Sequence, residues 1–175
     1  RPGAHQGVNA LGCQYMCPPC LGRAGEAMKA AMEALAAVMG KEAAVRRPAG
    51  TVVLGTVKGD IHEIGKNLVA TMLSANGFKV HDIGADAAPE AFVEKAREVH
   101  ADLIGASALL TTTMHGQQEI IRRLEQAGLR KQVRVIIGGA PVTRDWVKEI
   151  GADGYSEDAL GAVKVASELL GVPCA

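Results

Sequence analysis

After residue 50, the sequence alternates between short apolar runs rich in β-branched residues and longer segments with helical spacing, and this alternation constrains the fold most. The apolar runs, which we expect to be strands, lie at 51–57, 78–83, 102–107, 133–137 and 154–155. The segments that we expect to be helices lie at 64–75, 89–99, 114–127, 144–150 and 158–170. Strands separated by helices of this length pair in parallel through right-handed crossovers. The chain is therefore expected to build one parallel sheet with helices on both faces.

This alternation predicts the α/β class and a three-layer, doubly wound, five-stranded parallel sheet in the flavodoxin-like (Rossmann-type) strand order 2-1-3-4-5. In that order, the carboxyl ends of the first, third and fourth strands meet at one rim of the sheet. Open α/β sheets bind their ligands at this rim. The residues that follow those three strands are therefore the candidates for a site.

The first fifty residues differ in character from the rest. Residues 1–23 contain scattered Pro and Gly and predict a loop. The alanine-rich segment 24–39 predicts a helix. One apolar stripe of this helix is formed by Met28, Met32, Leu35 and Met39. We divide the chain into 1–40, a charged linker at 41–50, and the sheet domain at 51–175.

Composition excludes several classes of function. Lys plus Arg and Asp plus Glu both number 19, so the net charge is zero and no basic patch predicts nucleic-acid binding. The longest apolar runs have the length of strands, so we expect no membrane span. The start lacks both an initiator Met and a signal peptide, which fits a fragment of a longer chain. Cys13, Cys17 and Cys20 crowd together, unlike a secreted disulfide framework, and this predicts a reducing, cytoplasmic location.

The segment Gly59-Asp60-Ile61-His62-Glu63-Ile64-Gly65 joins the first expected strand to the helix that follows it. Asp60 is close enough in sequence to accept a hydrogen bond from one imidazole nitrogen of His62. Such a bond would fix the tautomer and leave the other nitrogen free for a metal. Gly65 has no side chain, so a bulky group can approach the backbone there. Taken alone, a histidine in a polar loop is usually solvated and an aspartate there is most often a turn residue.

Two further stretches follow the third and fourth expected strands at the same rim. The first, 107–114, places a cluster of hydroxyl groups after Ser107, and the second, 136–141, contains Gly138 and Gly139. Together they predict a cleft for a long ligand tail, with small residues clearing its path and Ser107 offering a polar contact. Each also has a simpler interpretation. Ser107 could satisfy a strand end, the glycines could form an ordinary turn, and residues 111–113 could cap a helix.

The three stretches together resemble the fingerprint of corrinoid (cobalamin)-binding domains. The pattern reads Asp60-x-His62-x-x-Gly65, then 41 residues, then Ser107-x-Leu109, then 28 residues, then Gly138-Gly139. The resemblance implies a base-off, His-on cofactor, whose lower base leaves cobalt and threads into the fold while a histidine replaces it. By resemblance, His62 is the cobalt axial ligand and Asp60 its hydrogen-bonding partner. Ser107 would contact the buried base, and Gly138 and Gly139 would line the tail channel.

The same resemblance implies a set of functional residues. His62 and Asp60 would act in the chemistry at cobalt, and His62 would be the metal ligand. The residues expected to bind the cofactor are Gly59, Asp60, His62, Ile64, Gly65, Ser107, Leu109, Thr111, Gly138, Gly139, Ala140, Tyr155 and Ser156. His81, His100 and His115 have no partners at ligand spacing, and we expect them at the surface.

The flanking residues resemble the methyl-carrying branch of these proteins, which includes the methionine synthase cobalamin domain and the small corrinoid proteins of methanol- and methylamine-type methyltransferase systems. This resemblance is carried by GDIHEIGKN (59–67), LTTTM (110–114), GGAPVT (138–143) and GADGYS (151–156). It implies a corrinoid subunit of a methyltransferase system in one-carbon metabolism rather than a complete enzyme. A substrate-specific methyltransferase would load cobalt, which alternates between cob(I) and methyl-cob(III), and a second, acceptor methyltransferase would unload it. A reductive activator is a further implied partner.

In the small corrinoid proteins of these systems, a four-helix cap precedes the linker. The stretch QYMCPP (14–19) and the expected helix at 24–39 resemble the end of that cap, so residues 1–40 are interpreted as a partial helical cap. The spacing of Cys13, Cys17 and Cys20 also matches radical-SAM iron–sulfur ligands, and with a fourth ligand these thiolates could hold zinc. We favour the cap because no barrel follows the cysteines.

Three other functions share parts of this pattern. The cobalamin domain of an adenosylcobalamin-dependent mutase has the histidine motif but usually differs after the third strand. A cobalamin-dependent sensor usually carries a DNA-binding region, and this sequence holds no recognisable one. A flavodoxin-like signalling domain without a cofactor would leave the spacing of the three stretches unexplained. The expected function is therefore methyl transfer through a corrinoid.

Overall fold

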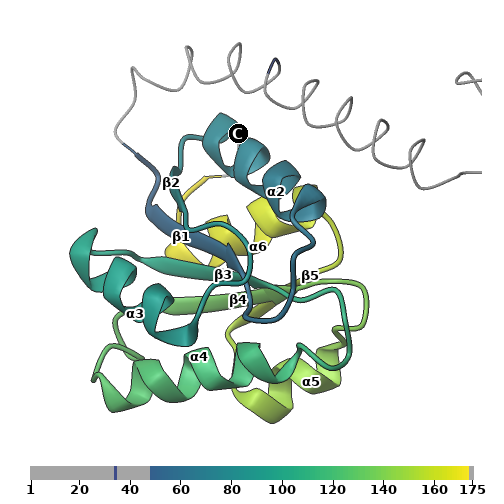
Figure 1. The fold of residues 1–175 in the computed structure, drawn as a ribbon. Helices are drawn as coiled ribbons and strands as arrows, with labels where there is room; N and C mark the ends of the chain where they lie inside the picture. The colour runs from purple at the N-terminus through teal and green to yellow at the C-terminus, as the bar shows by residue number, and fades with distance from the viewer. Residues whose placement is uncertain (1–33, 35–47, 174–175) are drawn as a thin grey trace, which may run out of the picture.

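A computed structural model describes Ala34 and residues 48–173 of the chain, and residues 48–173 form a parallel sheet between two layers of helices (Figure 1). The strands are β1 (Thr51–Thr56), β2 (Lys79–Asp82), β3 (Leu103–Ser107), β4 (Arg134–Gly138) and β5 (Gly154–Ser156). The helices are α2 (Ile64–Ala75), α3 (Pro89–Glu98), α4 (His115–Gln126), α5 (Arg144–Ile150) and α6 (Ala159–Leu170). The expected cap, most of the linker and the three clustered cysteines lie outside the described residues.

The strand order is β2-β1-β3-β4-β5, and every neighbouring pair is parallel, which confirms the predicted topology. The expected elements appear with bounds shifted by one residue at most. The helix expected at 158–170 begins at Ala159, because Asp158 is its N-cap and accepts a hydrogen bond from the backbone N–H of Gly161. No helix in the described ranges has both the length and the apolar character needed to cross a membrane.

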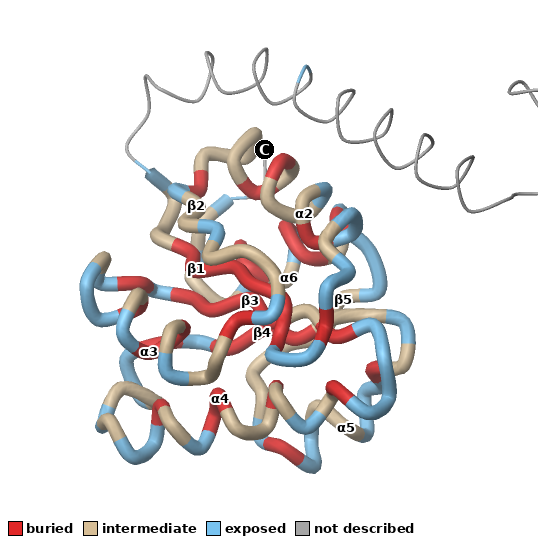
Figure 2. The backbone as a smooth tube through the Cα atoms, in the orientation of Figure 1, coloured by how far each residue is buried: buried red, intermediate tan, exposed pale blue. Residues whose placement is uncertain are grey.

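The helices are divided between the two faces of the sheet, α2 and α6 on one and α3, α4 and α5 on the other (Figure 1). The larger buried cluster lies on the second face, and its residues from the strands are Val53, Ile104, Ala106, Val135 and Ile137. The smaller cluster lies under α2 and α6, and its residues from the strands are Val52, Leu103 and Ile136. Burial is concentrated in the central strands, whereas the loops at their ends are largely exposed (Figure 2). Residues alternate between the two clusters along each strand, as the two-residue period of a strand requires.

This alternation brings small residues together at the carboxyl ends of four strands. The register pairs Thr56 with Ser107, Ser107 with Gly138, and Gly138 with Ser156. All four share the face of Val52, Leu103 and Ile136, and therefore face α2 and α6. We call Thr56, Ser107, Gly138 and Ser156 the small-residue row.

His81 corrects one expectation. Its Nε2 atom is buried without a hydrogen-bond partner, and burial lowers the pKa of the ring, with Lys79 and Lys95 acting in the same direction. In β2, His81 pairs with Val53, so it shares that residue's face of the sheet and is half-buried rather than exposed. His100 and His115 are exposed, as predicted.

Candidate functional site

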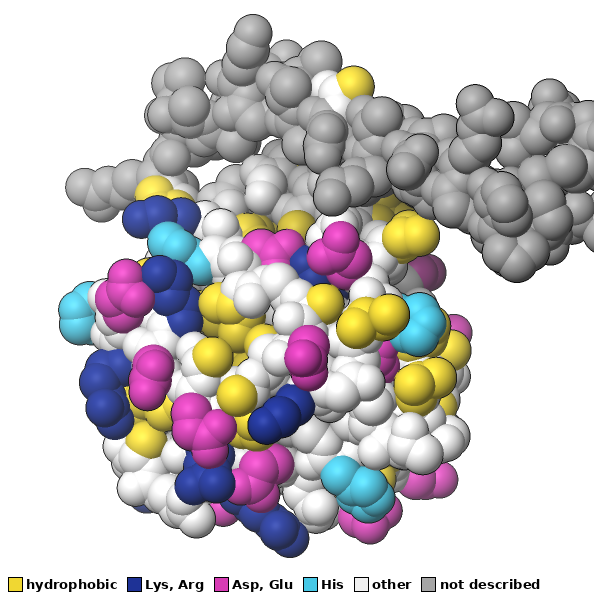
Figure 3. Space-filling model, in the orientation of Figure 1, with side chains coloured by type: hydrophobic (Ala, Val, Ile, Leu, Met, Phe, Trp, Pro, Cys, Tyr) yellow, Lys and Arg dark blue, Asp and Glu magenta, His cyan; other side chains and the backbone are white. Residues whose placement is uncertain are grey.

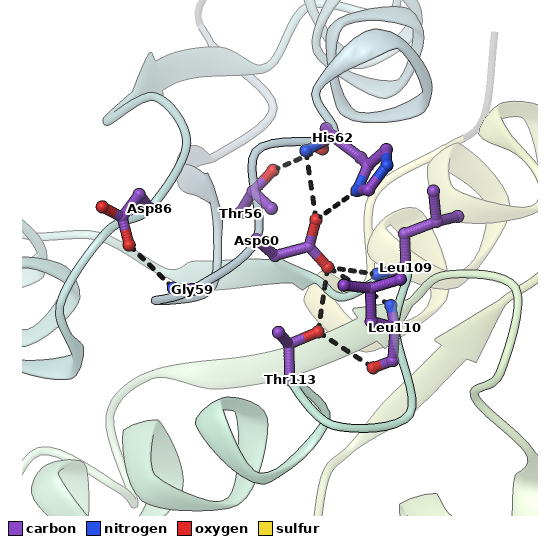
Figure 4. Close-up of polar contacts among 8 residues, drawn as sticks. All are labelled: Thr56, Gly59, Asp60, His62, Asp86, Leu109, Leu110 and Thr113. Carbon is purple, nitrogen blue, oxygen red and sulfur yellow. Dashed lines mark hydrogen bonds and ion pairs between the residues drawn. The ribbon is translucent and has the colours of Figure 1, made fainter.

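Asp60 is the centre of the polar contacts at the carboxyl rim, and its side chain is fully buried (Figure 4). Its Oδ1 accepts the backbone N–H of His62 at 3.0 Å and lies 2.7 Å from the His62 Nδ1 atom. Its Oδ2 accepts the backbone N–H groups of Leu109 at 2.7 Å and Leu110 at 3.3 Å. The hydroxyl of Thr113 donates to the same oxygen at 2.9 Å. The carboxylate therefore joins the β1–α2 loop to the β3–α4 loop.

These contacts determine the charge of Asp60. Burial works to raise the pKa of its carboxyl, but hydrogen bonds from the backbones of His62 and Leu109 and from the side chains of His62 and Thr113 outweigh burial. The pKa is held well below its usual range, so Asp60 is an ionised carboxylate at neutral pH. An ionised carboxylate only accepts hydrogen bonds, so Nδ1 of His62 is the donor. In the neutral imidazole, Nε2 then carries the lone pair, as the sequence predicted.

The His62 side chain is 48% exposed, so the imidazole is held at its Nδ1 edge while much of the ring stays accessible. The hydroxyl of Thr56 donates to the His62 carbonyl at 3.0 Å and secures the loop from the end of β1. Exposed large apolar side chains come from the same two loops and the start of α2: Ile61, Ile64, Leu109 and Leu110. On the face drawn in Figure 3, hydrophobic side chains are grouped on one flank beside a histidine. The loops that hold the accessible imidazole therefore also present apolar side chains to solvent.

Thr113 is a site residue that the sequence analysis did not identify. The hypothesis that residues 111–113 cap a helix is wrong, because α4 has no side-chain cap, and Thr111 is exposed. Thr113 is buried, and its hydroxyl contacts both Asp60 and the carbonyl of Leu110. The threonine run was visible in the sequence, but which threonine turns towards Asp60 depends on the path of the loop.

The two glycines at the end of β4 have different roles. Gly138 belongs to the small-residue row. Gly139 has φ +125°, and a Cβ atom there would lie 1.8 Å from the carbonyl oxygen of Ala108. Only glycine allows the backbone to pass this close. The loop that carries Leu109 is therefore packed directly on the end of β4, and Ala140, the next residue, is exposed.

Among the remaining predicted residues, Gly65 and Gly59 lie in or next to the β1–α2 loop, whereas Tyr155 lies away from the site. At Gly65, a Cβ atom would have no neighbour within 4 Å, which agrees with an open approach to the start of α2. Gly59 has φ +83° and donates its N–H to the Asp86 carboxylate, a residue that the sequence analysis also missed. Tyr155 packs against the cluster on the α3, α4 and α5 face, so the structure does not bring it together with Ser156 and the small-residue row.

Two buried polar side chains, one on each face of the sheet, make contacts close to the carboxyl ends of the strands. Gln117 is fully buried on α4, donates to the carbonyls of Ala106 and Gly138, and accepts the indole N–H of Trp146 at 3.1 Å. On the other face, the buried ammonium of Lys66 pairs with Asp82 at the end of β2. Neither role was evident from the sequence, because both depend on contacts between distant elements.

Comparison with known proteins gives one consistent result. Residues 50–164 match the B12 binding domain family. The chain is 48% identical over 172 residues to dimethylamine corrinoid protein 1 of Methanosarcina acetivorans, covering 96% of this chain and 80% of that protein. The Methanosarcina barkeri monomethylamine corrinoid protein has a similar structure, with a TM-score of 0.78 and 41% identity over 89% of this chain and 73% of that chain. A chain of the methanol:cobalamin methyltransferase complex MtaBC from the same organism gives a TM-score of 0.68 and 32% identity over 75% of this chain and 50% of that chain.

Proposed function

Because this chain belongs to the B12-binding domain family, among the methylamine corrinoid proteins, we propose that His62 is the axial ligand of cobalt in a bound corrinoid that carries a methyl group between two methyltransferases. The observation that carries the proposal is the buried Asp60 carboxylate, which accepts a hydrogen bond from Nδ1–H of an accessible imidazole. Metal-binding histidines are commonly held by a carboxylate in this way, because the second hydrogen bond fixes both the tautomer and the ring direction.

The residues around His62 suit a corrinoid. A single protein nitrogen is what a metal already held by a macrocycle requires. The exposed apolar side chains of Ile61, Ile64 and Leu109 would be covered by the ring, which removes apolar surface from water. The small-residue row would offer glycine and hydroxyl groups to a tail inserted between the sheet and its two helices. These features support the base-off, His-on arrangement.

A bound corrinoid would supply a cobalt atom that accepts and releases the methyl group. Asp60 would hold the imidazole in position and raise its basicity, and it would stabilise the protonated ring whenever the imidazole leaves the metal. Thr113 and the backbone N–H groups of Leu109 and Leu110 would keep Asp60 ionised throughout. The chain itself would contribute ligation and the movement of one proton at His62.

The proposed partners follow from this carrier role. A substrate-specific methyltransferase would load the corrinoid, an acceptor methyltransferase would unload it, and a reductive activator would restore the active metal. A methylamine is the proposed methyl source, since the relative at 48% identity is named for dimethylamine. The cytoplasmic location inferred from the cysteine pattern belongs to the same proposal.

The test is the visible absorption spectrum of the whole chain titrated with hydroxocobalamin, compared with His62→Ala. We expect the wild-type protein to shift the spectrum of the corrinoid. His62→Ala should lose that shift, because this variant has no imidazole to bind cobalt. His115→Ala is the matched control, since it removes another exposed histidine. The proposal fails if the wild type and His62→Ala give the same spectrum with the corrinoid bound.

A further inference from the structure

Asp86 lies in the β2–α3 loop, and it contacts the β1–α2 loop on both sides of one peptide bond. We propose that Asp86 is a positioning residue that acts through Asp60 to hold His62 in its ligating orientation, an inference that rests on the proposed function. Its carboxylate accepts the N–H of Gly59 at 2.7 Å (Figure 4), and its own N–H donates to the carbonyl of Asp60 at 2.9 Å. The peptide between Gly59 and Asp60 is thus flanked by two hydrogen bonds to one residue.

The β2–α3 loop is placed for this role by an extension of parallel pairing beyond the strands. The N–H of Thr56 donates to the carbonyl of Gly84 at 2.9 Å, and the N–H of Ala87 donates to the carbonyl of Thr56 at 3.0 Å. Val57 and Ala87 form an isolated parallel bridge. The β2–α3 loop therefore runs beside the start of the β1–α2 loop, and this places Asp86 next to Gly59 and Asp60.

The conformation of Asp86 has a local cost. Its φ is +53°, and His100 is the other non-glycine residue with positive φ among the described residues. Aspartate tolerates this region better than most residues, but strained backbone persists only where surrounding contacts determine it. The carboxylate does not cap the following helix, because the N-cap position of α3 is Ala88. The two hydrogen bonds to Gly59 and Asp60 are therefore the contacts that explain this conformation.

The need for this contact follows from Gly59. Glycine has the greatest backbone freedom of any residue, and Gly59 sits at φ +83° directly before Asp60. Rotation there would change the direction of the Asp60 carboxylate and hence of the His62 ring. The β3–α4 loop holds the side chain of Asp60, whereas Asp86 holds its backbone. Both restraints are needed to fix one orientation of the imidazole.

Three substitutions separate the hydrogen bond from the backbone conformation. Asp86→Asn keeps an oxygen acceptor and tolerates positive φ, so we expect it to behave as the wild type within about twofold. Asp86→Gly keeps the backbone conformation but removes the acceptor. Asp86→Ala removes the acceptor and adds strain. We expect Asp86→Gly to weaken His62-dependent corrinoid binding by roughly three- to tenfold, the effect of one hydrogen bond, and Asp86→Ala to weaken it further.

The decisive readout does not require the corrinoid. Nitrogen-15 NMR of the cofactor-free chain at about pH 8, where a free imidazole is neutral, reports which His62 nitrogen carries the proton, with His62→Ala assigning the signals. We expect mainly the Nδ1–H tautomer in the wild type and Asp86→Asn, and a mixture in Asp86→Gly. Asp102→Gly is the matched control, because Asp102 also accepts one backbone N–H, from Thr51 at 2.8 Å, at the opposite end of the sheet.

The outcomes separate this inference from the proposed function. Equal tautomer ratios in the wild type and Asp86→Gly would overturn the role of Asp86, as would an equal change in Asp102→Gly, which would indicate general loosening. A hydroxocobalamin titration in which the wild type shows no His62-dependent shift would overturn the proposed function instead. In that case, the tautomer ratio still decides whether Asp86 holds His62.

Discussion

The two faces of the sheet differ most at the carboxyl ends of the strands. The face covered by α3, α4 and α5 is filled to the rim by buried apolar residues, namely Val57, Ala108 and Ile137. The face covered by α2 and α6 carries the small-residue row, namely Thr56, Ser107, Gly138 and Ser156. Each apolar residue of the first set is the sequence neighbour of a small residue in the second. Because successive side chains of a strand point to opposite faces, the same strand ends place apolar residues on one face and small residues on the other.

A buried polar side chain on each face, Gln117 and Lys66, differs in the same way in its access to water. Gln117, on the filled face, has its whole amide paired with two carbonyls and an indole inside the core. Lys66, on the other face, pairs with Asp82, whose side chain is 35% exposed. The filled face therefore closes the core at the rim with apolar residues, whereas the face of α2 and α6 carries small residues there, where we propose that the corrinoid tail inserts.

The largest expected effect comes from breaking the filled face at Gln117. Gln117→Met keeps the volume but removes the hydrogen bonds to the carbonyls of Ala106 and Gly138, the second of which still accepts the N–H of Ala108, and leaves the indole N–H of Trp146 without this acceptor. We expect a loss of about 3 kcal/mol in the free energy of unfolding, because three buried hydrogen bonds are lost and each contributes about 1 kcal/mol. Urea denaturation measures it. A loss below about 1 kcal/mol would show that these groups find other partners or water.

A matched pair of substitutions at neighbouring positions tests the comparison directly. Ala108→Leu adds a large side chain to the filled face and should cost about 1–3 kcal/mol of stability by overpacking. Ser107→Leu adds the same side chain over Gly138 on the other face, and its stability should change by less than about 1 kcal/mol. Its corrinoid affinity should instead fall about tenfold or more, because overpacking against the tail costs about 1.4 kcal/mol or more.

Denaturation curves and hydroxocobalamin titrations of both variants give the four values needed. If Ser107→Leu binds the corrinoid as tightly as the wild type, the small-residue row does not receive the tail. If both variants lose stability equally, the two faces are packed alike and the comparison fails.

The sequence predicted this architecture well because its determinants are local. The bounds of α2 follow from apolar residues four apart, such as Val69 and Leu73, and the Asp60–His62 pair lies within three residues. The contacts it missed join distant segments. Thr113 reaches Asp60 across 53 positions, and its orientation depends on how the β3–α4 loop turns. Tyr155 and Ser156 were predicted together, but strand alternation sends adjacent side chains to opposite faces.

A smaller effect is expected at Lys66, on the face of α2 and α6. Lys66→Met replaces the buried ammonium with an apolar chain of similar length and leaves Asp82 partly exposed to water. Exposure lets water solvate the lone carboxylate, and buried ion pairs add little net stability, so we expect a change within about 1 kcal/mol. Asp82→Asn should cost more, because it leaves the buried ammonium facing a neutral group. A loss in Lys66→Met as large as in Gln117→Met would remove the contrast between the faces.

The smallest effect concerns pH and the edge of the filled face. Burial, then Lys79 and Lys95, lower the pKa of His81, while Glu98 acts in the opposite direction. A histidine whose folded pKa lies below its unfolded value contributes stability that is fully present above about pH 6.5 and is lost as pH falls through the folded pKa. His81→Leu removes the titrating group, so the stability of this variant relative to the wild type should increase as the pH is lowered from about 8 to about 5. Urea midpoints at both values measure this, and an unchanged difference between variant and wild type would show that protonated His81 is solvated. In that case, this edge of the filled face would be as open to water as the rim that holds His62.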